Sequence, residues 1–109
     1  MTRVWYRVRD LGEARSFYTA KLGFTETHAH DGWVKLERGL MRIALAEGAP
    51  EEDAPVAVVD VDDVKSEAER LRGEQVETGT VLELHDEARI VDVFDPDGNR
   101  LQLIQQLRP

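Results

Sequence analysis

The sequence contains no cysteine in 109 residues. This absence excludes disulfide bonds, thiolate nucleophiles and every zinc or iron–sulfur site that depends on cysteine. Long apolar runs are absent too, since no stretch approaches the roughly 20 apolar residues of a membrane-spanning helix. The first fifteen residues also lack the apolar segment of a secretory signal peptide. We therefore expect a soluble cytoplasmic protein with no membrane partner.

Basic residues are outnumbered. The chain has 14 Lys and Arg against 22 Asp and Glu, which gives a formal net charge of −8. Such a surface repels phosphates, so we expect no nucleic-acid partner. The sequence also lacks the GxSxG, P-loop and GxGxxG motifs, so it offers no signature of a serine hydrolase, an NTPase or a dinucleotide-binding enzyme.

A turn motif stands near the C-terminus, where Asp95-Pro96-Asp97-Gly98-Asn99 separates two apolar runs, 90–94 and 101–104. Proline presets φ for a turn, glycine supplies a positive φ, and Asp and Asn side chains bond back to their own backbone. The motif predicts a tight hairpin.

The N-terminal part predicts a strand that leads into a capped amphipathic helix. Asp10 with Glu13 fits a capping box, and Gly23 stands where a left-handed residue ends a helix. Apolar residues between these caps fall on one helical face: Ala14, Phe17, Tyr18 and Leu22.

The chain divides into two similar halves when Val8 is laid on Val61 and Asp10 on Asp63. Asp63 then predicts the start of a second helix and Gly73 its left-handed C′ residue. The acidic, aperiodic segment 48–54 predicts a linker, and Gly32, Gly39 and Gly98 predict hairpin turns. We expect strands at 3–9, 24–30, 33–37, 41–47, 55–61, 75–84, 89–94 and 100–106.

Together these motifs, V-R-D-L with F-Y and L-G-F and then D-P-D-G-N-R-L-Q-L-I, resemble the glyoxalase/bleomycin resistance protein/dioxygenase superfamily, the vicinal oxygen chelate fold. The resemblance covers residues 3–105. It implies an α+β fold in which two βαβββ modules form a cupped mixed sheet with a helix behind each half. We expect one domain, 1–109, with modules at 1–47 and 55–109. Relatives of this length commonly complete their cavities across a two-fold interface, so the resemblance also implies a homodimer.

Alternation along the predicted strands divides them into two faces. Val4, Tyr6 and Val8 suit a face beneath a helix, and the resemblance implies that the opposite, concave face holds a ligand. The candidate ligand-binding residues are Arg3, Trp5, Arg7, Trp33, Arg42, Ala44, Val56, Asp60 and Gln102.

Two alternatives stay open for these side chains. The tryptophans either stack on a planar ligand or pack against a partner subunit. The arginines either attract an anionic ligand or pair with Asp60, Glu37 or Glu47. In glutathione-using relatives the position that matches Arg7 contacts a substrate carboxylate, which supports the first alternative for the arginines.

The resemblance also implies where a divalent metal would lie, at Arg3, Ala44, Val56 and Gln102. Ala and Val have no ligand atom, Arg is a permanent cation, and only the Gln amide oxygen could coordinate. We therefore expect no metal, no cofactor and no catalytic residue.

The favoured hypothesis is a metal-free small-molecule binding protein of the bleomycin-resistance type, which sequesters a planar or antibiotic-like ligand in a dimer cleft and is not an enzyme. The first alternative is a metal-dependent glyoxalase-like lyase or ring-cleaving dioxygenase with displaced ligands, drawn from Glu26, His28 and His30 with Gln102. The second is a partner-interaction module.

Overall fold

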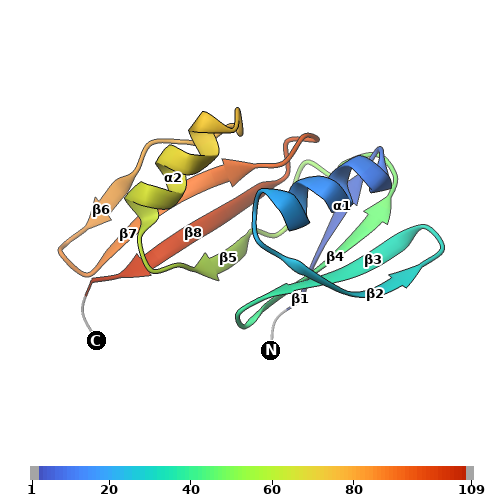
Figure 1. Ribbon diagram of the computed structural model, residues 1–109, viewed down its shortest axis with the longest axis horizontal. Helices are drawn as coiled ribbons and strands as arrows, with labels where there is room; N and C mark the ends of the chain where they lie inside the picture. Colours follow the sequence, from blue (N-terminus) through green and yellow to red (C-terminus); the bar gives the residue numbers. More distant parts are fainter. Residues whose placement is uncertain (1–2, 108–109) are drawn as a thin grey trace.

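The computed structural model describes residues 3–107 as two four-stranded sheets, each with one helix packed against it (Figure 1). The first module comprises β1 (Arg3–Val8), α1 (Leu11–Ala20), β2 (Thr25–His30), β3 (Trp33–Arg38) and β4 (Met41–Glu47). The second comprises β5 (Ala57–Asp60), α2 (Val64–Gly73), β6 (Leu82–Leu84), β7 (Ala88–Phe94) and β8 (Arg100–Gln106). The predicted α+β fold is confirmed.

Both modules have the same topology. The strand orders are β1-β4-β3-β2 and β5-β8-β7-β6. In each sheet the first and last strands of the module pair in parallel and the other neighbours pair antiparallel. The βαβββ repeat that the sequence predicts is therefore present in both halves.

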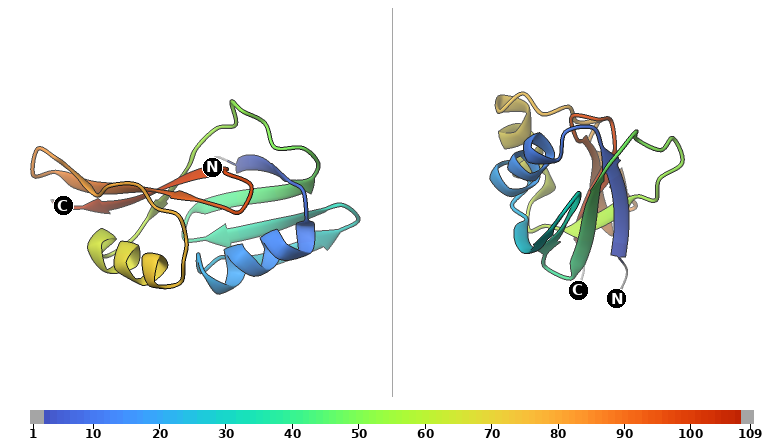
Figure 2. Two further views of the ribbon diagram at one scale, coloured as in Figure 1. Left: turned by 90° about the horizontal axis from the view of Figure 1, so that it is seen from above. Right: turned by 90° about the vertical axis from the view of Figure 1, so that its right-hand side faces the viewer.

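The two helices lie on one side of the molecule, and the segment between β4 and β5 rises on the other (Figure 2). Each sheet thus has one face that a helix covers and one open face, and the two open faces are turned to the same side. Within residues 3–107, neither helix is long or apolar enough to cross a membrane.

The side chains on the covered faces form the hydrophobic core. Val4, Tyr6 and Val8 of β1 are buried, and their neighbours alternate to the open face as predicted. On β8, Leu101 and Leu103 take the same role.

Three of the predicted helix caps are confirmed. The Asp10 carboxylate accepts a hydrogen bond from the backbone N–H of Glu13, and Asp63 does the same for Ser66. These bonds satisfy backbone donors that a helix N-terminus leaves without a partner, and the bonds from Ser66 lower the pKa of Asp63. Gly23 has a φ of +72° at the end of the first helical segment.

The predicted end of the second helix is wrong. Gly73 is helical, and the left-handed residue is Gln75, with a φ of +64°. The backbone N–H of Val76 donates to the carbonyl of Leu71 and that of Gln75 donates to Arg72, which is the Schellman pattern. The helix therefore runs two residues past its expected stop and ends with a glutamine in the position that glycine usually takes.

The predicted strand 75–84 is wrong in its first half. The helix-ending turn occupies the segment up to Val76, and Thr78 forms only an isolated bridge with Val93. The Arg72 guanidinium donates to the Thr78 hydroxyl and to the carbonyl of Gly79, which holds this segment to the helix. Regular pairing with β7 begins only at Leu82.

The predicted turn at 95–99 is confirmed, with a φ of +84° at Gly98, but it also joins the two modules. The Asp95 carboxylate accepts hydrogen bonds from the Tyr18 hydroxyl, the Asn99 side-chain amide and the backbone N–H groups of Asp97 and Asn99. Asn99 in turn donates to the carbonyl of Arg7 in β1. Asp95 and Asn99 are only 5% and 4% exposed. We call this buried arrangement of Tyr18, Asp95 and Asn99 the polar joint.

Tyr6 makes a second connection between the modules. Its hydroxyl accepts a hydrogen bond from the backbone N–H of Ala57 and donates to the carbonyl of Arg100. Burial raises the pKa of Tyr6 to about 12, and the negative charge of Asp95 adds to the effect. For Tyr18, burial and then Asp95 raise the pKa well above its usual value.

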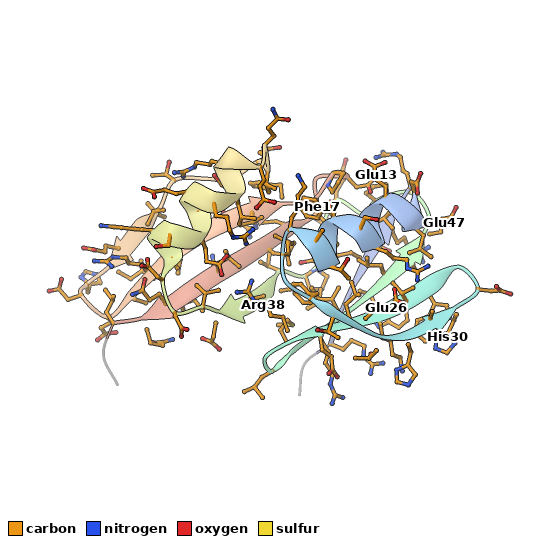
Figure 3. The ribbon with its side chains drawn as sticks, viewed as in Figure 1. Glu13, Phe17, Glu26, His30, Arg38 and Glu47 are labelled. Atoms are coloured by element: carbon orange, nitrogen blue, oxygen red, sulfur yellow. The ribbon has the colours of Figure 1, made fainter. Side chains whose placement is uncertain are left out.

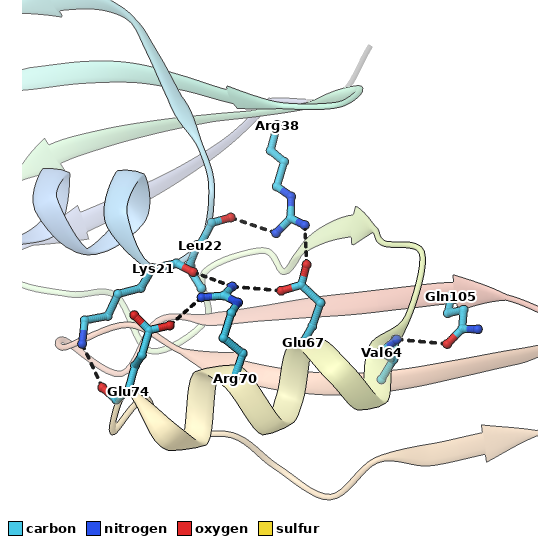
Figure 4. Close-up of polar contacts among 8 residues, drawn as sticks. All are labelled: Lys21, Leu22, Arg38, Val64, Glu67, Arg70, Glu74 and Gln105. Carbon is cyan, nitrogen blue, oxygen red and sulfur yellow. Dashed lines mark hydrogen bonds and ion pairs between the residues drawn. The ribbon is translucent and has the colours of Figure 1, made fainter.

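A surface network joins the modules near the end of α1 (Figure 4). Arg38 of β3 donates to the carbonyl of Leu22 and to the Glu67 carboxylate of α2. Arg70 also pairs with Glu67, at 3.0 Å. Burial by itself would raise the pKa of Glu67, but the bonds from the two arginines outweigh it and the pKa is lowered.

Candidate ligand-binding face

The two tryptophans lie together on the open face of the first sheet. Trp5 on β1 and Trp33 on β3 stand on either side of β4, and their ring centroids are 5.5 Å apart with an interplanar angle of 37°. Ala44 is the register partner of Trp5 and Ala46 that of Trp33. These small side chains leave room for the two rings above β4.

Two histidines extend the tryptophan pair. His30 stacks on Trp33 with a centroid distance of 4.0 Å and an angle of 11°, and His28 lies parallel to His30 at 6.2 Å. The Lys35 ammonium lies 5.5 Å from the centroid of Trp33. We call His28, His30, Trp33 and Trp5 the aromatic row.

Sequence reasoning did not include the histidines or Lys35 in this face. It considered His28 and His30 as displaced metal ligands of the first alternative. The register of β2 and β3, in which His30 faces Trp33 across the turn, is the signal that could have identified them.

The arginines on this face differ in their partners. Arg42 pairs with Glu37 at 3.0 Å, and Arg7 pairs with Glu51 of the segment between β4 and β5 at 2.9 Å. Pairing with Glu37 was expected for an arginine here, whereas Glu51 replaces the expected Asp60 or Glu47. Arg3 forms no ion pair with another residue of the range 3–107. A pocket of about 190 Å³ lies between Arg3, Arg42, Lys35 and His28.

The other candidate residues lie in the second module. Gln102 of β8 lies beside Asp92, 3.4 Å from its carboxylate, and is the register partner of Val58. Asp60 ends β5, and Val56 precedes it. A register row of mainly apolar side chains crosses this open face and consists of Leu82, Ile90, Ile104 and Asp60.

The candidate residues therefore form two half-sites. The first sheet carries Arg3, Trp5, Arg7, Trp33, Arg42 and Ala44, and the second module carries Val56, Asp60 and Gln102. Because the open faces are turned to the same side, each half-site is open to solvent in the single chain.

The four positions that the family resemblance assigns to a metal form two equivalent pairs. In the first sheet Arg3 pairs with Arg42, and Arg42 lies two residues before Ala44. In the second module Gln102 pairs with Val58, and Val56 lies two residues before Val58. The side chains do not fit a divalent ion, because Ala44 and Val56 offer no ligand atom and Arg3 carries a positive charge. Within residues 3–107, no group of three or more His, Asp or Glu side chains is arranged to hold a metal.

The structure also places Glu26 on a different face of β2 from His28 and His30, the residues considered as displaced metal ligands. A bulge between Glu26 and His28 changes the alternation of β2. Glu26 consequently turns toward α1, where both of its oxygens accept hydrogen bonds from Arg15 at 2.7 and 2.9 Å. His28 and His30 remain on the open face, and Figure 3 shows Glu26 and His30 pointing in different directions.

Comparison with known proteins agrees with this architecture. A family model described as Glyoxalase/Bleomycin resistance protein/Dioxygenase superfamily matches residues 1–103. No curated protein sequence matches the chain.

Three solved structures illustrate the range of similar folds. TnmS3, an antibiotic binding protein from Streptomyces sp. CB03234, is 22% identical with a TM-score of 0.76, and the alignment covers 95% of this chain and 93% of that one. The bleomycin resistance determinant encoded on transposon Tn5 is 19% identical with a TM-score of 0.77 and 97% of both chains covered. Lactoylglutathione lyase from Agrobacterium tumefaciens is 16% identical with a TM-score of 0.77, covering 96% of this chain and 92% of that one. These similarities concern the fold, which an antibiotic binding protein, a resistance determinant and a lyase share.

Proposed function

The chain belongs to the glyoxalase/bleomycin resistance protein/dioxygenase superfamily, and from this premise we propose that it is a metal-free small-molecule binding protein. It holds a planar or antibiotic-like ligand in a cleft between two copies of the chain. It is not a metal-dependent lyase or dioxygenase. The similar structures include both an antibiotic binding protein and a resistance determinant.

The aromatic row is the observation that carries the proposal. Trp5 is 48% exposed although its ring is large and apolar, and it lies against Trp33. Burying an exposed indole face against a planar ligand removes apolar area from water, at about 25 cal/mol for each Å². Binding by stacking needs no reacting group.

The charges beside the row indicate the kind of ligand. Arg42 and Arg7 are already paired with carboxylates, so they contribute little to the field above the sheet. Arg3 and Lys35 leave a positive edge beside the tryptophans. A planar ligand with an anionic group at one edge matches this arrangement.

A second copy of the chain completes the cleft. The open face of the second sheet exposes Val58, Leu82 and Leu84, and exposed apolar patches of this kind mark interaction surfaces. An apolar half-site from one chain facing the aromatic row of another would enclose a planar ligand on both sides.

Fluorescence and native mass spectrometry test the proposal. Both tryptophans of the chain belong to the aromatic row, so their emission reports ligand binding at this face. We expect 2-naphthoate to quench this emission, and a Trp5→Ala variant to bind it at least tenfold more weakly. Leu40→Ala, which removes an exposed residue in the turn between β3 and β4, is the matched control and should bind within twofold of the wild type. Native mass spectra should show a dimer. Equal binding by Trp5→Ala, or a monomer with no affinity for the probe, would contradict the proposal.

The metal-free part has its own test. Adding Zn²⁺, Ni²⁺ or Mn²⁺ should leave the melting temperature of the wild type unchanged, because a ligand stabilises only a folded state that binds it. A four-ligand variant, with Arg3→His, Ala44→Glu, Val56→His and Gln102→Glu, should gain a melting shift that EDTA abolishes. A wild type that carries one tightly bound divalent ion per chain would favour the metal-dependent enzyme instead.

A further inference from the structure

A second cavity lies on the helix side of the molecule, away from the open faces. It has a volume of about 550 Å³ and lies between α1, the segment after α2 and the end of β7. One wall is a single stripe of α1 formed by Glu13, Ser16, Phe17 and Ala20, and the other wall is the segment 74–77. Figure 3 labels Glu13 and Phe17 on α1. We call this cavity the helix-side groove.

The lining of the groove is mixed, and several of its side chains are apolar. Phe17 is half-buried and packs against the core, and Val76 on the opposite wall is buried. Ala20 and Pro96 add further apolar surface. Small-molecule sites are concave and of roughly 300–1,000 Å³, so the volume suits a ligand of modest size.

A negative charge without a cationic partner lines the groove. Asp95 lines it, and all four hydrogen bonds to the Asp95 carboxylate come from neutral groups: the Tyr18 hydroxyl, the Asn99 amide and two backbone N–H groups. Four donors and no acceptor fit an ionised carboxylate. These neutral donors stabilise the charge of Asp95 without cancelling it, so its electric field acts on the groove that it lines.

Negative charges also outnumber positive charges among the other residues that line the groove. Glu13 and Glu77 form no ion pair with another residue of 3–107, whereas the Glu74 carboxylate is paired with Arg70 at 2.6 Å. The one cation of the lining, Lys21, directs its ammonium to the carbonyl of Glu74 at 2.8 Å. The groove therefore combines apolar side chains with an excess of negative charge.

We propose that the helix-side groove is a second binding site, which takes a small ammonium compound that carries an aromatic ring. The hydrophobic part packs between Phe17 and Val76, and the ammonium group lies in the field of Asp95, Glu13 and Glu77. The site does not depend on the function proposed for the open face.

Nuclear magnetic resonance titrations with three probes test the ligand class. The probes are 2-phenylethylammonium, phenylacetate with the opposite charge, and ethylammonium with no ring. We expect 2-phenylethylammonium to bind with a Kd on the order of 1 mM, as nine heavy atoms of ordinary efficiency allow. The other two should bind at least tenfold more weakly. The backbone amide signals of Ala20, Lys21 and Val76 should shift, and the indole signals of Trp5 and Trp33 should not.

Two matched arginine variants locate the site. Ala20→Arg places a long cation in the groove. Thr19→Arg adds the same charge at the adjacent exposed position of α1, which does not line the groove. We expect Ala20→Arg to weaken binding of 2-phenylethylammonium at least tenfold and Thr19→Arg to stay within twofold. Equal weakening by both variants, equal binding of phenylacetate, or shifts that gather at the two indoles would each overturn the proposal. The indole result would move the cation to the open face, and a failure at the groove would leave the function proposed for that face untouched.

Discussion

Replacing Tyr18 by phenylalanine should destabilise the chain by about 2 kcal/mol, within the range for a hydrogen bond to a charged group. The Tyr18 hydroxyl lies 2.8 Å from the Asp95 carboxylate, and both residues are buried. Phenylalanine keeps the ring, so the variant leaves no large cavity. The Asp95 oxygen that loses the hydroxyl still accepts from the Asn99 amide, so the cost should stay below that of an orphaned carboxylate.

Alkaline pH gives a second measure of the same contact. Tyr6 and Tyr18 are the only two tyrosines, and both have pKa values raised above the usual 10, to about 12 for Tyr6. A raised folded-state pKa means that the stabilisation is complete below about pH 10 and is lost as the pH rises toward the folded value. Each tyrosine should contribute a slope of about 1.4 kcal/mol per pH unit in this window. Tyr18→Phe should remove one such contribution.

The assay is urea denaturation at pH 7 and at intervals from pH 9.5 to 12, with absorbance near the tyrosinate band as a second signal. Tyr6→Phe is the comparison variant. It leaves the buried backbone N–H of Ala57 without its partner and should therefore cost more than Tyr18→Phe at pH 7. A loss below about 0.5 kcal/mol for Tyr18→Phe lies outside the range for a hydrogen bond to a charged group. Either that result or an unchanged dependence of stability on alkaline pH would refute the role given to the polar joint.

Three further changes test other parts of the structure. Gly73→Ala should raise stability by about 0.5–1 kcal/mol, because Gly73 is helical and open space surrounds its Cα; thermal unfolding would measure this, and a decrease would contradict the observed end of α2. Gly98→Val should lower stability by about 1–3 kcal/mol, because its φ is +84°, and an unchanged melting temperature would mean that the turn tolerates a β-branched residue. Glu67→Gln should reduce the loss of stability on acidification, since the lowered pKa of Glu67 gives stabilisation that is present above about pH 4.5 and lost as the pH falls through the folded value. Denaturation curves for variant and wild type between pH 2 and 6 should diverge most at the upper end of this range.

The features that could be predicted from the sequence depend on near neighbours in the chain. The Asp10 and Asp63 caps follow from residues three positions apart. The buried face of β1 follows from strict alternation, and the turn at Gly98 follows from residues that favour positive φ. Each of these signals is local, and each was confirmed.

The features that could not be predicted depend on distant contacts. Gly73 was expected to be the left-handed residue that ends the second helix, but it is helical, and the hydrogen bonds that end the helix place Gln75 in that position. The bulge in β2 moved Glu26 to the face of α1, where Arg15 binds it, and no alternation pattern reveals an inserted residue. The pairing of Arg7 with Glu51 likewise depends on the path of the segment between β4 and β5.

The turn motif illustrates the same division. Its residue types predicted a hairpin, which is ordinarily exposed, and they gave no sign that Asp95 would be buried against Tyr18. That contact spans 77 positions of the sequence. A motif can therefore predict the conformation of a segment without predicting what it binds.

The polar joint has a consequence for how this fold diversifies. The joint and the Tyr6 contacts fix the angle between the modules with side chains that lie inside the protein, while the residues of the aromatic row lie on the other face of the first sheet. Substitutions on the open face can therefore change the chemistry of that face without altering the geometry of the scaffold. Such a separation lets the exposed surface vary at small cost in folding. The three solved structures named above share this fold at TM-scores of 0.76–0.77 although they are only 16–22% identical to this chain.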